Sequence, residues 1–76
     1  MNKERRKLIQ NIIDRLGEIR EDIDTVTEEE RDYCDSIPEN LQGSERYDRA
    51  EEAVTNLEDA MDNVDEAIGM LESAME

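Results

Sequence analysis

The sequence predicts an all-α protein in which residues 1–76 form one antiparallel two-helix coiled-coil hairpin, and three observations support this. Apolar residues recur at alternating intervals of three and four over two long segments, which is the heptad pattern of a coiled coil. A short segment between them holds the only proline. The chain includes two Tyr but no Phe or Trp, so its apolar side chains are almost all aliphatic, as is typical of helical bundles.

The first helix is expected over residues 3–35. Its seam, meaning the side that faces the other helix, follows from the three-four spacing and includes Glu30 as its one charged member. The predicted seam residues are Ile9, Ile12, Leu16, Ile19, Ile23, Val26, Glu30, Tyr33 and Ile37. Leu8 and Ile13 flank this seam, and we expect the second helix to leave them uncovered.

The connection is expected over residues 36–44, because Pro38 cannot continue a helix at low cost. Ser36 is expected to cap a short turn around Pro38, and Ser44 is a good N-cap for the next helix. The second helix is expected over residues 45–75, with a seam that repeats the three-four spacing without a break. Its predicted seam residues are Tyr47, Ala50, Val54, Leu57, Met61, Val64, Ile68, Leu71 and Met75.

Folding the chain about the middle of the loop predicts the register of the two helices, because an antiparallel coiled coil requires matched layers. The predicted layers, from the chain ends toward the loop, are Ile9 with Leu71, Ile12 with Ile68, Leu16 with Val64, Ile19 with Met61, Ile23 with Leu57 and Val26 with Val54. Beside the seam, Arg20 is expected near Glu58 and Arg6 near Glu72. Such exposed ion pairs contribute only a few tenths of a kcal/mol each.

A column of alanines, meaning residues that recur every seven positions on one side of a helix, runs beside the second seam. One interpretation is that Ala is simply the best helix former at a half-exposed position. The other is that small side chains let a second hairpin pack closely, which would bury apolar surface that one hairpin leaves wet. We expect a homodimer that forms a four-helix bundle, or a higher oligomer. The residues expected in this contact are Ala53, Ala60, Ala67, Ala74, Leu8 and Ile13.

The charge is strongly acidic, with 23 acidic and nine basic residues and a formal net charge of −14. Such a chain repels nucleic acid and anionic membrane surfaces. The expected partner is therefore a protein with a basic surface, with no direct binding to nucleic acid or membrane. The candidate partner-binding residues are Glu51, Glu52, Glu58, Asp59, Asp65, Glu66 and Glu72 of the second helix, with Asp22, Asp24, Glu28 and Glu29 of the first.

These carboxylates have two interpretations. Charge runs on helices are commonly just solvated surfaces. Alternatively, the net charge spread along the hairpin approaches the charge density of one DNA strand, which carries a phosphate about every 3.4 Å, so the hairpin could occupy a basic nucleic-acid-binding surface. The main functional hypothesis is such an acidic inhibitor. The alternative is a structural or assembly protein whose function is homo-oligomerisation.

Catalytic, metal and cofactor chemistry is not expected. The chain has no His, and Cys34 is the only cysteine, so neither a thiol-imidazole pair nor a zinc-ligand set can form. We therefore expect no enzyme activity and no cofactor. The apolar runs are too short for a signal peptide or a membrane span, which predicts a cytoplasmic protein.

Three segments carry a resemblance to other proteins. They are the basic opening 1–7, the loop segment 36–46 and the Ala-Val-Thr-Asn-Leu-Glu-Asp-Ala stretch at 53–60. In these segments the chain resembles short, uncharacterised acidic helical proteins of Gram-positive bacteria and their mobile elements. In physical type it is similar to phage-encoded acidic inhibitors, including anti-CRISPR proteins and DNA mimics. This resemblance implies an inhibitor that acts by occupying a basic surface.

Overall fold

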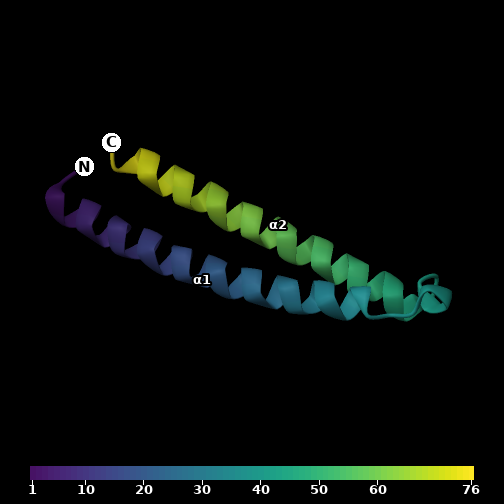
Figure 1. The fold of residues 1–76 in the computed structure, drawn as a ribbon. Coiled ribbons are helices and arrows are strands. Elements are labelled where there is room, and N and C mark those ends of the chain that lie inside the picture. The colour runs from purple at the N-terminus through teal and green to yellow at the C-terminus, as the bar shows by residue number, and fades with distance from the viewer.

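The computed structural model describes residues 1–76 as two long antiparallel helices joined by a short connection (Figure 1). Helix α1 spans Lys3–Asp35, a single 3-10 turn η1 spans Glu39–Leu41, and helix α2 spans Glu45–Ala74. Both chain ends lie together at the end of the molecule opposite the loop. The molecule measures 59 × 15 × 12 Å. The predicted all-α antiparallel hairpin is confirmed, with α2 ending one residue earlier than expected.

The loop is bounded by two serines that have different roles. Ser44 is the N-cap of α2, as expected, because its side-chain oxygen accepts a hydrogen bond from the backbone N–H three residues later at 3.3 Å. Ser36 does not cap the turn around Pro38. It ends α1 instead, and its hydroxyl donates to the carbonyl of Tyr33 at 2.7 Å. The prediction for Ser36 was wrong because the carbonyls of the last turn of α1 need donors too.

The seam of α2 agrees with the three-four spacing. All nine of its predicted residues are buried or half-buried, and Ala50 and Met61 are the most covered, with 3% and 8% of their surface exposed. A regular seam of this kind is possible because the helix has no charged residue at those positions. The alanine column lies directly beside it.

The seam of α1 differs from the prediction at every second layer. Four expected seam residues point outward and are 36–50% exposed, namely Ile12, Ile19, Val26 and Tyr33. Each is replaced by its neighbour along the chain. The residues that take these places are Ile13, Arg20, Thr27 and Cys34, of which Thr27 and Cys34 are fully covered and the other two half-covered. Only the seam residues shared by both patterns were predicted correctly, namely Ile9, Leu16, Ile23, Glu30 and Ile37.

Side-chain size explains this choice of seam. Thr27 is completely buried, and Cys34 and Ala50 are also small and buried, so the two helices approach closely near the loop. The hydroxyl of Thr27 is satisfied because it donates to the carbonyl of Ile23 at 2.7 Å. Further from the loop, Arg20 covers the seam with its aliphatic stem while its guanidinium reaches the edge. A ranking of the residues by hydrophobicity alone accounts neither for the close packing of small residues nor for the covering of the seam by an arginine stem.

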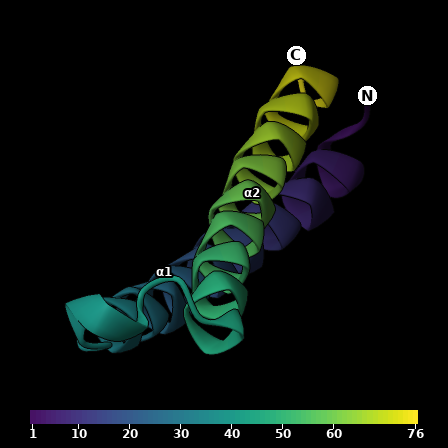
Figure 2. The same ribbon diagram turned by 90° about the vertical axis from the view of Figure 1, so that its right-hand side faces the viewer.

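The register is also displaced, by about one helical turn. Cys34 and Ile37 form a small buried cluster with Ala50, and Tyr47 packs against it. If Cys34 lies level with Ala50, then the residue eleven positions before Cys34 lies level with the residue eleven positions after Ala50. Ile23 is therefore level with Met61 rather than with Leu57, and both Ile23 and Met61 are covered. Seen from the loop end in Figure 2, α1 passes behind α2 from one side to the other, so the helices cross as in a coiled coil.

This register gives the hairpin two different broad faces. On one face, Arg31 of α1 meets Glu58 of α2 at 3.6 Å. On the opposite face, the guanidinium of Arg46 lies 5.3 Å from the ring centre of Tyr33 and donates a hydrogen bond to its hydroxyl. We call these the acidic face and the apolar face. The acidic face carries Asp24, Glu28, Glu51, Glu58, Asp65 and Glu72, and the apolar face carries Ile12, Ile19, Val26, Tyr33, Ala53, Ala60, Ala67 and Ala74.

The displaced register can be tested with engineered cysteines in a chain that carries Cys34→Ala. Cysteines at Ile23 and Met61 should form a disulfide within one chain, because a disulfide requires a Cβ separation of about 3.5–4.5 Å and residues at the same level of the seam approach each other most closely. The measurement is the fraction of cross-linked monomer after mild oxidation. Efficient linkage at Ile23 and Leu57, with none at Ile23 and Met61, would contradict this register.

The seam of α1 can be tested with two matched threonine substitutions. Thr27→Asp places a carboxylate in the covered seam and should lower the free energy of unfolding by roughly 2–4 kcal/mol. Thr25→Asp adds the same charge at an exposed position two residues away and should change it by less than about 0.5 kcal/mol. Urea unfolding followed by circular dichroism measures both. Equal losses in the two variants would show that Thr27 is not in the seam.

Candidate functional site

Acidic side chains occupy two columns along α2. The first column lies on the acidic face and the second lies on the side of α2 that points directly away from α1. The first consists of Glu51, Glu58, Asp65 and Glu72, and the second, the outer column, consists of Glu52, Asp59 and Glu66; all seven are exposed. Residues seven apart on a helix are separated by about 10.5 Å along its axis, so these columns form an acidic band over most of α2.

Two arginines of α1 reach this band. Arg20 Nε lies 2.6 Å from Asp65 Oδ1, and Arg31 lies 3.6 Å from Glu58. Arg20 was expected beside Glu58, which lies seven residues before Asp65. The one-turn change in register accounts for part of this difference, and the inward position of Arg20 in the seam accounts for the rest. The hydrogen bond from Arg20 and the charge of Asp65 raise the pKa of the guanidinium. These two contacts leave the other carboxylates of the band without a cationic partner in the chain.

The acidic cluster predicted on α1 is divided between the two faces. Asp24 and Glu28 lie near Arg31, on the acidic face, and so extend the band of α2. Asp22 and Glu29 lie one turn from Val26, at the margin of the apolar face, because residues three and four apart share one side of a helix. The structure therefore brings nine of the eleven predicted partner-binding residues to the acidic face and the outer column.

The alanine column and its predicted companions are also divided. Ala53, Ala60 and Ala67 are half-buried beside the seam, and Ala74 at the end of α2 is exposed. Leu8 is 65% exposed, as expected of a residue outside the seam. Ile13 was expected outside the seam, and this was wrong: it is half-buried and takes the seam position that had been assigned to its neighbour.

The prediction missed four residues that now belong to the apolar face: Ile12, Ile19, Val26 and Tyr33. They recur every seven residues. Two three-four series pass through α1 and share every second member, so the spacing alone allowed either set to face α2. The signal that could have separated them is the pair of small residues Thr27 and Cys34, which suits close helix packing near a loop.

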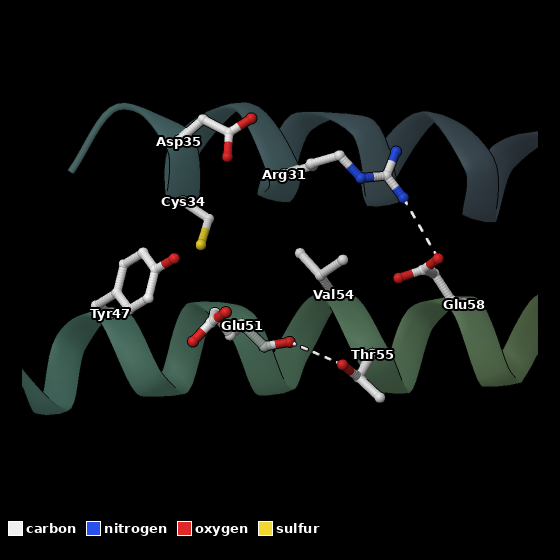
Figure 3. Close-up of a pocket in the computed structure, with 8 residues that line it drawn as sticks. All are labelled: Arg31, Cys34, Asp35, Tyr47, Glu51, Val54, Thr55 and Glu58. Carbon is white, nitrogen blue, oxygen red and sulfur yellow. Dashed lines mark hydrogen bonds and ion pairs between the residues drawn. The ribbon is translucent and has the colours of Figure 1, made fainter. Parts of the chain in front are cut away.

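One hollow of about 270 Å³ opens on the acidic face near the loop (Figure 3). Cys34 of α1 lies at its floor, and the hydroxyl of Tyr47 points toward the sulfur. Burial raises the pKa of the Cys34 thiol above its ordinary value of 9.0, and the charges of Glu51 and Asp35 raise it further. The raised pKa favours the protonated thiol at neutral pH, which is the less nucleophilic form.

The hollow offers little for a small ligand. Its other lining groups include three carboxylates and Arg31, which already contacts Glu58. An anion would meet these carboxylates, and the one nearby cation is engaged. No group of three or more Cys, Asp or Glu residues is placed to hold a metal ion. Neither helix combines the length and apolarity needed to cross a membrane.

Comparison with known proteins adds no further constraint: no protein family, curated protein or solved structure matches this chain.

The raised pKa values near the loop predict lower stability at alkaline pH. Burial also raises the pKa of Tyr47 above its ordinary value of 10.0. The folded chain therefore keeps the protons of Cys34 and Tyr47 to a higher pH than the unfolded chain does. Their contribution to stability is complete below pH 9.0 and is lost as the pH rises through the raised values.

Urea unfolding between pH 7.5 and 10.5 should show this loss in the wild-type chain. The control is a chain with Cys34→Ala and Tyr47→Phe, which lacks both ionisations and should show a smaller loss. All other titrating groups are the same in the two chains. Parallel curves for the two chains would contradict the assignment to Cys34 and Tyr47.

Proposed function

We propose that the hairpin is a non-enzymatic protein-binding module whose acidic face and outer column occupy a basic, nucleic-acid-binding surface of another protein. The observation that carries this proposal is the segregation of charge. Nine candidate carboxylates lie on the acidic face and the outer column, none of them lies on the apolar face, and only Glu58 and Asp65 contact an arginine of the chain. The remaining carboxylates are exposed and have no cation to neutralise them.

The shape and charge of the rod suit such a surface. A net charge of −14 along a length of 59 Å is one negative charge per about 4 Å, close to the phosphate spacing of about 3.4 Å along one DNA strand. Two packed helices also hold the carboxylates in a fixed arrangement, which lowers the entropy lost on binding. A protein carried by a phage or mobile element that inhibits a nucleic-acid-binding protein would use a surface of this kind.

A second candidate function, self-association, is favoured by a separate observation. Ile19 and Val26 are 48% and 50% exposed beside the half-buried alanines of α2. Large apolar side chains in a row are typical of protein contact surfaces. The alternative function is therefore an assembly protein that acts through a helical bundle.

The acidic-band proposal can be tested with two charge-matched variants. The test variant carries Glu52→Gln, Asp59→Asn and Glu66→Gln in the outer column of α2. The control carries Glu4→Gln, Glu18→Gln and Asp32→Asn, which lie on the corresponding outward side of α1. Each variant loses three negative charges, so both change from −14 to −11. All six side chains are exposed, and none is in the seam.

The measurement is capture of proteins from a bacterial extract on immobilised wild-type, test and control chains. We expect the wild type and the control to retain the same basic nucleic-acid-binding protein, and the test variant to retain much less. Duplex DNA should displace that protein, and binding should weaken from low to moderate salt because exposed charges are screened within about 10 Å at 0.1 M. Equal capture by all three chains, unaffected by salt, would contradict the proposal.

A further inference from the structure

The apolar face combines large side chains from one helix with small ones from the other. Every seven residues α1 places a bulky side chain on this face, and every seven residues α2 places an alanine there. Leu8 and Met70, which are 65% and 63% exposed, continue the same surface toward the chain ends. The register of the seam sets Ile19 at about the level of Ala67, and Val26 at about the level of Ala60.

A single hairpin cannot cover this surface. Only five of the 76 residues are buried, and a large aliphatic side chain gains its full stabilisation of about 1.5–3 kcal/mol only when it is removed from water completely. Ile19 and Val26 each keep about half of their surface exposed. The free energy still available on this face is therefore large compared with the small core of one chain.

The charges around the apolar face indicate what can cover it. Its margins carry few of the acidic residues that dominate the chain: of 23 acidic and nine basic residues, the face and its margins hold Asp22, Glu29, Arg5, Arg15, Arg46 and Arg49. This is the only side of the hairpin where basic residues outnumber acidic ones. Two copies of a strongly acidic chain can meet here with their acidic bands pointing away from each other. A basic partner would be attracted to the opposite face.

We propose that two copies pack through their apolar faces into a four-helix bundle with both loops at the same end. The twofold axis runs along the length of the bundle, so α1 of each copy lies across α2 of the other. This inference rests on self-association, the second candidate function, and is independent of the role of the acidic band. The bundle presents an acidic band on each of its two outer sides.

Side-chain size selects this orientation over the opposite one. With both loops at one end, each large residue of α1 meets an alanine of the second copy, as Ile19 meets Ala67 and Val26 meets Ala60, and layers of large and small residues pack evenly. With the loops at opposite ends, α1 would pack against α1, so that bulky residues would meet bulky residues and the alanines would face each other. The helices would then be held at unequal distances.

The polar margins are compatible with this orientation. When both loops lie at one end, Asp22 and Glu29 of one copy come level with Asn63 and Asn56 of the other, and amide groups can donate to carboxylates.

The first test measures mass in solution. The wild-type chain at micromolar concentration should have twice the 8.8 kDa mass of one chain. A variant with Ile19→Glu and Val26→Glu should have the mass of one chain and keep its helical circular dichroism, because both side chains lie outside the seam. A control with Asn11→Glu and Thr25→Glu adds the same charge at exposed positions and should remain a dimer. A wild-type mass of 8.8 kDa, or a dimeric Ile19 and Val26 variant, would overturn the inference.

The second test measures orientation, with single-cysteine chains that also carry Cys34→Ala. A mixture of an Ile19→Cys chain and an Ala67→Cys chain should give a disulfide-linked heterodimer, identified by mass spectrometry. A mixture of Ile19→Cys and Val26→Cys chains should give little. The reverse result in a dimeric protein would overturn the orientation and leave self-association intact. Linkage in neither mixture would reject this face as the contact. Neither result bears on the acidic-band proposal, whose variants alter other residues.

Discussion

The close packing of small side chains near the loop is the contact on which the rest of the hairpin depends. Thr27, Cys34 and Ala50 are nearly or fully buried, and Ile37 folds back from the loop to close the end of the seam. Small residues let the helix backbones approach, and packed interiors do not tolerate intermediate positions. Once this cluster is formed, the three-four spacing determines every layer toward the chain ends.

The consequence of this cluster extends along the whole of α1. Because the helix is rigid, placing Thr27 inward also turns Arg20 inward and turns Ile19 and Val26 outward. The hairpin thus gains a tight junction near the loop and gives up apolar burial further away. Arg20 limits that cost, since its stem covers the seam and its charge is met by Asp65 at 2.6 Å.

The same rotation of α1 creates the two faces. With Ile19 and Val26 in the seam, this side of the hairpin would have carried no row of large side chains from α1, and its apolar residues would have been the alanines, Leu8 and Met70. With them outside, a heptad row of bulky residues lies beside the alanine column, while the carboxylates of α2 lie on the other face with Arg31 and Asp24. Apolar and acidic surfaces on opposite sides allow one chain to use each for a different contact without mutual interference.

Local sequence determined the two helices, the loop, the N-cap at Ser44 and the seam of α2. These features depend on capping, on Pro38 and on one uninterrupted spacing pattern, all of which act over a few residues. The acidic columns of α2 were also predictable, because they follow from the position of its seam. The exposure of Leu8 was predictable too, because this residue belongs to neither of the two three-four series of α1.

Tertiary structure alone decided the inward side of α1, the register and therefore the composition of each face. Two series in α1 share Leu16 and Ile23, and hydrophobicity favoured the one with Ile19 and Val26. The two packings differ by a small rotation of one helix and a shift of about one turn. Such a difference is settled by how side chains of unequal size fit across the interface, and that fit exists only when both helices are in place.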